Sequence, residues 1–167
     1  MRKPLRIIQI DDDPGDRALV LREMCKEFGE IESVEVRDEQ EFQRALERGG
    51  FDLAITDYHI GWTDGLKVLR AIKGKYPDCP IVMLTGTGTE EVAVEAMKLG
   101  LDDYVLKQPQ RMVRLGAAAR AALEKVGLRL ERRRDHEALR ESEERFRQMA
   151  EHIQQVFYVV SLDPRKM

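Results

Sequence analysis

The sequence predicts an α/β protein with a doubly wound, five-stranded parallel sheet and an extended C-terminal helix. Short apolar segments alternate with helical ones five times along the chain, which is typical of parallel sheets with right-handed crossovers. The run 52–60 is apolar, contains Ile and Thr, and carries Asp57 near its end, as expected of a buried strand that delivers an acid. From Gln110 onward the apolar residues take a helical spacing that continues for several turns.

The five strands are predicted where apolar or alternating runs are bounded by turn residues. They cover Leu5–Ile10, Ile31–Val36, the central run ending at Asp57, Ile81–Leu84 and Asp103–Leu106. The four helices between them each carry an apolar stripe, and most have glycine after their last residue. They cover Pro14 to about Glu27, Glu39–Arg48, Leu66–Lys75 and Thr89 to Gly100, while residues 61–65 are predicted to form a loop.

The C-terminal segment has two apolar stripes at helical spacing. The first follows steps of three and four with one stutter, as in coiled coils; it contains Met112, Leu115, Ala119, Ala122, Val126 and Leu130. The second contains Leu139, Phe146, Met149 and Ile153. Residues 155–160 are rich in β-branched and aromatic side chains and are predicted to turn strand-like. We interpret the basic run 132–134 as a solvated helix face, because acids flank it.

Charge is distributed unevenly along the 167 residues. Residues 1–110 hold 15 basic and 22 acidic groups, a net of −7, and residues 111–167 hold 13 and 9, a net of +4. The acidic part argues against nucleic acid as a direct ligand. No apolar run approaches the length of a membrane span. Cys25 and Cys79 form no C-x-x-C pair, so we expect free thiols and a cytoplasmic location.

Polar groups suited to phosphate chemistry follow four of the predicted strands. They are Asp11 and Asp12, Asp57, Thr85 and Lys107. Because several carboxylates at one sheet edge repel one another unless a cation joins them, we expect a Mg²⁺ site with hard oxygen ligands. Lys107 offers a positive charge and Thr85 a hydroxyl donor to a phosphoryl group. Since an aspartate can itself be phosphorylated as a nucleophile, this set is interpreted as a phosphoryl acceptor.

With these residues in place, segment 4–125 resembles the receiver domain of two-component response regulators. Ile10–Pro14 is similar to the acidic pocket of that family and Asp57 to its phosphoacceptor. Thr85 resembles the switch hydroxyl, Tyr104 the switch aromatic and Lys107 the family's lysine. The resemblance implies a flavodoxin-like sheet in the order 2-1-3-4-5 and phosphotransfer from a histidine kinase or phosphotransfer protein. It implies no enzymatic activity beyond autocatalytic phosphorylation and dephosphorylation.

The resemblance also assigns finer roles. Asp12, Asp57 and the backbone carbonyl of His59 would ligate Mg²⁺, with Asp11 supporting the ion through water. After phosphorylation Thr85 would move toward the phosphoryl group and Tyr104 would turn inward. His59 and Thr87, two residues after Asp57 and Thr85, would line the approach of water and tune the lifetime of the phosphoryl group.

Two departures from the family pattern stand close to these residues. Ile60–Gly61 occupy the place of a usual Met-Pro pair. Gln108 follows Lys107 where the family commonly has proline and a cis bond. Because a cis bond to a residue other than proline costs about 2.5–4 kcal/mol, we expect the Lys107–Gln108 bond to be trans.

The segment 141–158 has a weaker resemblance to the opening helix and first strand of a PAS sensor domain. We therefore divide the chain into a receiver domain (1–125), a coiled-coil-like linker helix (126–141) and a truncated PAS-like start (142–167). This organisation implies a conformational switch relayed through the C-terminal helix. It also implies a homodimer through the fourth and fifth helices and the C-terminal helix.

Two other functions compete with the phosphorylated switch. A pseudo-receiver that dimerises without phosphate is kept open by Gln108. A phosphatase of the haloacid-dehalogenase type would use Asp11 as its nucleophile with Asp13, Thr85 and Lys107. The phosphatase lacks a cap insertion here and gives Asp57 no role.

Overall fold

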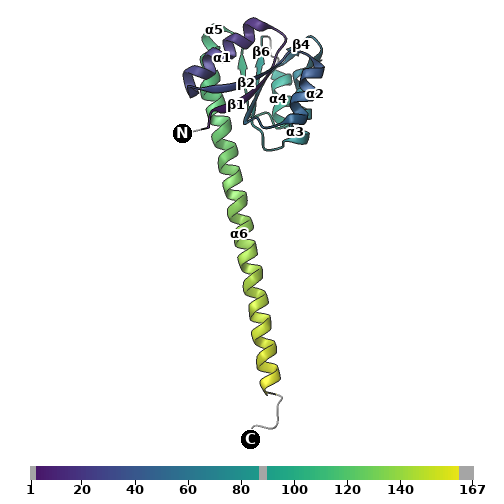
Figure 1. Cartoon of the computed structure of the whole chain (residues 1–167), viewed down its shortest axis with the longest axis vertical. Helices are drawn as coiled ribbons and strands as arrows, with labels where there is room; N and C mark the ends of the chain where they lie inside the picture. The colour runs from purple at the N-terminus through teal and green to yellow at the C-terminus, as the bar shows by residue number, and fades with distance from the viewer. Residues whose placement is uncertain (1–2, 87–89, 162–167) are drawn as a thin grey trace. The chain divides into compact units, whose positions relative to one another are not determined.

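The computed structural model describes residues 3–86 and 90–161. It contains a five-stranded parallel sheet in the spatial order β2-β1-β3-β6-β7 (Figure 1). The strands are β1 (Leu5–Ile10), β2 (Ile31–Val36), β3 (Leu53–Asp57), β6 (Ile81–Thr85) and β7 (Asp103–Leu106). Counted among the sheet strands alone, the order is 2-1-3-4-5, so the predicted fold class is confirmed.

Helices cover both faces of the sheet, because alternate residues of each strand point to opposite sides. The helices are α1 (Pro14–Phe28), α2 (Glu39–Arg48), α3 (Gly65–Lys75), α4 (Glu90–Lys98), α5 (Pro109–Met112) and α6 (Leu115–Ser161). Ile7 of β1 belongs to the core that α1 and the first turns of α6 bury, and its neighbour Ile8 belongs to the core under α2, α3 and α4. Figure 1 shows α2, α3 and α4 grouped on the side of the sheet opposite α1.

Aspartates fix the starts of three of these helices. Asp13, Asp38 and Asp64 are the N-cap residues of α1, α2 and α3, and each side chain accepts hydrogen bonds from backbone N–H groups of the first turn. Such caps satisfy donors that have no partner within the helix. Because α1 directly follows the carboxyl end of β1, its cap also holds the polar residues of that edge in place.

The predicted loop at residues 61–65 contains more structure than expected. β4 (His59–Ile60) and β5 (Thr63–Asp64) pair antiparallel around a turn at Gly61 and Trp62. Two-residue strands are too short to show the alternation of apolar and polar side chains on which strand prediction depends. The hairpin matters because it directly follows Asp57 and leads into α3.

The strand predicted for residues 155–160 is wrong, because α6 continues through them to Ser161. Val156 and Val160 extend the three- and four-residue spacing of the preceding helix, so the segment suits a helix as well as a strand. A helix also satisfies its own backbone hydrogen bonds, whereas a strand needs a neighbour. Within the described ranges no strand pairs with this segment.

Internal contacts divide the chain into two compact units, Met1–Val126 and Gly127–Met167. Leu115, Ala119, Ala122 and Val126 are buried in the first unit, so the first coiled-coil-like stripe is in fact the docking face of α6. The assignment of 126–141 as linker and 142–167 as PAS-like start stays a prediction. Among the described helices, none is long and apolar enough to cross a membrane.

An ionic network around the buried carboxylate of Asp102 joins elements at the amino edge of the sheet. Asp102, before β7, accepts a hydrogen bond from the backbone N–H of Ile81 at 3.0 Å and one from Lys73 of α3 at 3.2 Å. Lys125 of α6 forms a further ion pair with it at 3.6 Å. Lys73 also donates to the backbone carbonyl of Cys79. This network therefore ties α3, β6 and α6 together at the edge opposite the carboxyl ends of the strands.

Candidate functional site

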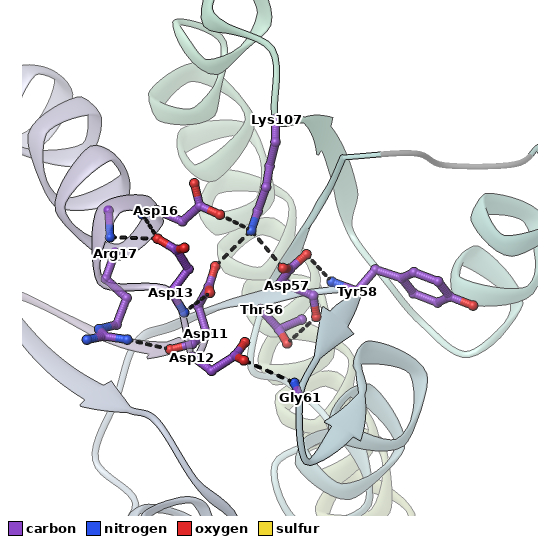
Figure 2. A network of polar contacts seen from close by, with 11 residues as sticks. Asp11, Asp12, Asp13, Asp16, Arg17, Thr56, Asp57, Tyr58, Gly61 and Lys107 are labelled. Atoms are coloured by element: carbon purple, nitrogen blue, oxygen red, sulfur yellow. Dashed lines mark hydrogen bonds and ion pairs between the residues drawn. The ribbon is translucent and has the colours of Figure 1, made fainter.

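The polar residues that the sequence places at strand ends lie at the carboxyl edge of the sheet, and Figure 2 shows Asp11, Asp57 and Lys107 meeting there. Asp11 follows β1, Asp57 ends β3, Thr85 ends β6 and Lys107 follows β7. β3 lies between β1 and β6, and β7 lies beside β6, so parallel pairing brings these ends together. Ligands of open α/β sheets bind at this edge.

Lys107 is the centre of the site. Its ammonium donates to the Oδ2 atoms of Asp11 at 2.9 Å, Asp57 at 2.7 Å and Asp16 at 2.5 Å (Figure 2). Burial by itself lowers the pKa of Lys107, but hydrogen bonds to Asp16, Asp57 and Asp11 outweigh that effect and raise the pKa above its usual value. Lys107 is therefore a permanent positive charge among three carboxylates.

Asp57 is held in place from both sides of its carboxylate. Oδ1 accepts a hydrogen bond from the backbone N–H of Tyr58 at 2.6 Å, and Oδ2 accepts from Lys107. The hydroxyl of Thr56 donates to the backbone carbonyl of Asp57 at 2.9 Å. The side chain is nearly buried, yet it lies at the open end of the strand rather than within the core.

Asp11 and its neighbours take three different roles. The carboxylate of Asp11 accepts from the backbone N–H of Asp13 at 2.8 Å, and burial raises its pKa despite the opposing contact with Lys107. Asp12 turns the other way and accepts a hydrogen bond from Gly61 of the hairpin at 3.3 Å. Asp13 caps α1, and hydrogen bonds from the N–H groups of Asp16 and Gly15 lower its pKa.

The carboxylates could hold a divalent cation. Oxygen atoms of Asp11, Asp16 and Asp57 all lie within 4.8 Å of one another. Hard oxygen donors at the open end of a sheet suit Mg²⁺, which usually needs only one or two carboxylates besides phosphate and water. Asp12 is outside this group, although its contact with Gly61 keeps it beside the hairpin that carries His59.

Thr85 has an unused hydroxyl. Its side chain is buried, and Oγ1 has no hydrogen-bond partner, although the backbone carbonyl accepts from the N–H of Lys107 at 2.8 Å. A buried hydroxyl without a partner costs about 1–3 kcal/mol, so a ligand that supplies an acceptor would be favoured. Tyr104, by contrast, is 39% exposed and points away from the core. Thr87 lies outside the described residues.

Two further residues of this site, Asp16 and Arg17, are not among those predicted from the sequence. Asp16 lies three residues after the N-cap Asp13, in the first turn of α1, and that spacing could have placed both acids on one side of the helix. Arg17 donates to the backbone carbonyl of Asp11 at 2.8 Å and pairs with Glu35 of β2. It thus links the ends of β1 and β2 to α1.

The peptide bond after Lys107 agrees with expectation. Within the described residues there is no cis peptide bond, so the Lys107–Gln108 bond is trans. Lys107 nevertheless reaches Asp57, because its backbone N–H pairs with Thr85 and fixes the chain at the end of β7. Gln108 then becomes the N-cap residue of α5, without a side-chain cap hydrogen bond.

Comparisons with known proteins agree with this geometry. The family model of the response regulator receiver domain matches residues 7–120. The response regulator protein FleR of Pseudomonas aeruginosa is 33% identical over 118 residues, which cover 71% of this chain and 24% of FleR. PilR of the same organism is 30% identical over 98 residues, which cover 59% of this chain and 22% of PilR. The chain thus spans about a quarter of the length of these curated relatives.

Solved structures give the same result. NtrX from Brucella abortus is 32% identical and superposes with a TM-score of 0.68, covering 77% of this chain and 29% of NtrX. A CheY-like receiver domain protein from Methanospirillum hungatei shares the fold, with 23% identity and a TM-score of 0.67, over 76% of this chain and 99% of that one. Because the family match spans most of the sequence and reaches all five strands of the sheet, this chain belongs to the response regulator receiver domain family.

Proposed function

We propose that this chain is a phospho-accepting switch that receives a phosphoryl group on Asp57 from a phosphohistidine. The observation that carries the proposal is the ammonium of Lys107, which hydrogen-bonds both Asp57 and Asp11 from a strand far away in the sequence. The unpartnered hydroxyl of Thr85 at the same edge supports it, because a phosphoryl oxygen would supply the missing acceptor.

The proposed transfer uses a carboxylate oxygen of Asp57 as the nucleophile. The P–N bond of the phosphohistidine breaks as a P–O bond to Asp57 forms, and the imidazole nitrogen keeps the electron pair and later takes a proton from solvent. Lys107 would then neutralise charge on a phosphoryl oxygen, and Thr85 would donate a hydrogen bond to another. Tyr104, exposed in this structure, would turn inward toward the space that Thr85 leaves.

Receiver domains bind Mg²⁺ through an acidic pocket, and the carboxylate cluster here could bind a metal. For this chain we propose Asp12, Asp57 and the backbone carbonyl of His59 as ligands, with Asp11 acting through water. When bound, the ion neutralises negative charge on the carboxylates and the transferring phosphoryl group. The hairpin supports this assignment, because Gly61 holds the carboxylate of Asp12 next to the segment that contains His59.

Receiver domains of response regulators interact with histidine kinases or phosphotransfer proteins and are generally not enzymes. We propose the same class of partner for this chain, with turnover limited to its own phosphorylation and dephosphorylation. His59 and Thr87 are proposed to tune how long the phosphoryl group persists. A cytoplasmic location is proposed as well, since Cys25 and Cys79 are free thiols.

The first experiment follows the mass and the fluorescence of the same samples. With Mg²⁺ and acetyl phosphate, wild type should gain one phosphoryl group by intact mass, and Asp57→Asn should gain none. Trp62 lies on the hairpin turn after Asp57, and the centroids of its ring and that of Phe42 are 5.8 Å apart. Because this turn directly follows the phosphoacceptor strand, Trp62 fluorescence should change upon titration with beryllofluoride. Absence of added mass under conditions that label another receiver would refute the proposal.

The pseudo-receiver is the remaining alternative, and the same experiment separates it from the switch. Gln108 is the residue that raised this possibility. Its trans bond leaves Lys107 in contact with Asp57, so the described geometry gives no reason for lost phosphorylation. A pseudo-receiver would bind no beryllofluoride, whereas the proposed switch binds it in a manner that requires Asp57.

We further propose that phosphorylation acts through a homodimer that involves α4, the face formed by α5 and α6, and the second stripe of α6. Three apolar residues of this stripe are spaced seven and three positions apart: Leu139, Phe146 and Met149. Their exposed fractions are 57%, 71% and 60%, respectively. A second copy would cover them in a coiled coil. Phe146→Glu should therefore reduce the mass measured by light scattering toward that of a monomer, whereas Gln148→Glu, with the same charge change beside the stripe, should not.

The PAS-like start stays a proposal for residues 142–167. The helix through Ser161 is compatible with the opening helix of such a domain, but its first strand does not lie at 155–160. Hydrogen exchange on residues 142–161 would test the assignment. Slow exchange that depends on Phe146 would indicate a packed helical segment, and uniformly fast exchange would argue against it.

A further inference from the structure

Asp16 makes a contact that the phosphoacceptor chemistry does not require. An ammonium group has three N–H donors. Those of Lys107 are directed to Asp11, Asp57 and Asp16, so all three are used by carboxylates of the protein itself (Figure 2). A phosphoryl oxygen on Asp57 could bind Lys107 only if one of these carboxylates gave up its hydrogen bond.

The three carboxylates differ in how easily they can be released. The side chains of Asp11 and Asp57 are 6% and 9% exposed, and both belong to the ends of buried strands. Asp16 lies in the first turn of α1, and its side chain is 35% exposed. Water can therefore replace Lys107 at Asp16, whereas the nearly buried carboxylate of Asp11 would pay a larger desolvation penalty if it lost its partner. Asp57 differs from both, because phosphorylation itself removes its carboxylate charge.

We propose that Asp16 is a positioning residue that holds Lys107 in the unphosphorylated protein and competes with the phosphoryl group for it. The inference rests on the proposed phosphorylation of Asp57. In the free protein Asp16 takes the third hydrogen bond of Lys107. In the phosphorylated protein a phosphoryl oxygen draws Lys107 away from Asp16, and the negative charge of Asp16 stays beside the new phosphate. Asp16 thus lowers the affinity of the site for a phosphoryl group.

Asp16→Asn tests this directly, because it removes the charge and keeps the size of the side chain. At saturating Mg²⁺, beryllofluoride is titrated into the full chain while Trp62 fluorescence is followed. Asp16→Asn should bind beryllofluoride about three- to tenfold more tightly than wild type, the scale of a charge-assisted hydrogen bond weakened by partial exposure. Asp16→Glu, which restores the carboxylate, should return the affinity toward that of wild type.

Glu39→Gln is the matched control, since it removes an acidic charge from the first turn of α2 at an exposed position. It should leave beryllofluoride affinity unchanged, which separates the contact with Lys107 from a general effect of net charge. Titration with Mg²⁺ alone supplies a second measurement. Asp16→Asn should change Mg²⁺ affinity less than about threefold, because in this proposal Asp16 serves Lys107 and not the ion.

The outcomes distinguish the inference from the proposed function. If wild type binds beryllofluoride through Asp57 but Asp16→Asn binds it equally or more weakly, the role of Asp16 is refuted and the switch stands. A loss of Mg²⁺ affinity of tenfold or more in Asp16→Asn would instead make Asp16 a metal ligand and overturn the inference. If wild type itself binds no beryllofluoride, both the proposed function and the inference fail.

Discussion

Gly65 is the position at which a single methyl group should damage the site most directly. A Cβ atom built there would lie 2.6 Å from the backbone oxygen of Asp57 and 2.9 Å from Cα of Tyr58. Ordinary contacts of this kind are 3.4 Å or longer, so the chain would have to move by about 0.8 Å. Both neighbours are backbone atoms of the segment that carries the phosphoacceptor, and neither can rotate away as a side chain would.

The expected cost of Gly65→Ala follows from overpacking against rigid atoms. Such substitutions typically cost about 1–3 kcal/mol. Alanine gains about 0.5–1 kcal/mol over glycine in a helix, which offsets part of that cost. We therefore expect a net loss of up to about 2.5 kcal/mol in the free energy of unfolding. Because Asp57 and Tyr58 must shift, beryllofluoride affinity should also fall by at least about tenfold.

Gly74 provides a matched control within the same helix, α3. A Cβ atom at Gly74 would meet nothing within 4 Å, and the position is exposed. Gly74→Ala should therefore increase the free energy of unfolding by about 0.5–1 kcal/mol and leave beryllofluoride affinity unchanged. Urea unfolding followed by circular dichroism measures both variants. Equal stability of Gly65→Ala and Gly74→Ala would refute the argument from close approach.

Three further substitutions test other parts of the chain. Burial raises the pKa of the Cys79 thiol to about 12. Because the thiol ionises more easily in the unfolded chain, the free energy of unfolding should fall as pH rises from about 9 toward 12, by up to about 1.4 kcal/mol per pH unit. Urea unfolding at several pH values should show that Cys79→Ala lacks this pH dependence. Asp38→Ala removes the cap of α2 and should cost about 1 kcal/mol in urea unfolding without altering beryllofluoride affinity; a neutral effect would contradict the assigned cap. Leu115→Ala, at a fully buried position of α6, should cost about 2–5 kcal/mol, and a cost below 1 kcal/mol would mean that α6 is not part of the folded receiver.

The sheet could be predicted from the sequence because two independent sequence signals indicate most of its strands. Each has an apolar or alternating run, and most end at a polar residue next to a helix start, as Ile10 and Asp11 do before Asp13. The boundaries of β1, β2, α2 and β7 accordingly agree with expectation. The convergence of Asp57 and Lys107 could also be predicted, because parallel strands place their carboxyl ends at one edge.

The remaining features depend on information that local pattern does not carry. Asp16 could be assigned to a helix start, but its contact with Lys107 joins residues 91 positions apart and depends on where β7 ends. The first stripe of α6 has the spacing of a coiled coil whether it packs on a second helix or, as Leu115 does, on the sheet. Spacing alone therefore indicated an amphipathic helix but not its partner.

The ionic network around Asp102 at the amino edge of the sheet differs from the one around Lys107 at the carboxyl edge, and the difference explains why only the carboxyl edge suits a ligand. Asp102 is one acid served by two lysines and a backbone N–H, so its two oxygens are satisfied by groups of the protein itself. At the carboxyl edge the proportions are reversed, with one lysine shared by three acids and the hydroxyl of Thr85 left over. The carboxylate of Asp102 already has its hydrogen-bond and ion-pair partners, so an added ion would have to displace one of them. The network around Lys107 carries excess negative charge, which favours a bound cation. The unpartnered hydroxyl of Thr85 is a hydrogen-bond donor for an anion, so this edge can bind a cation and an anion together.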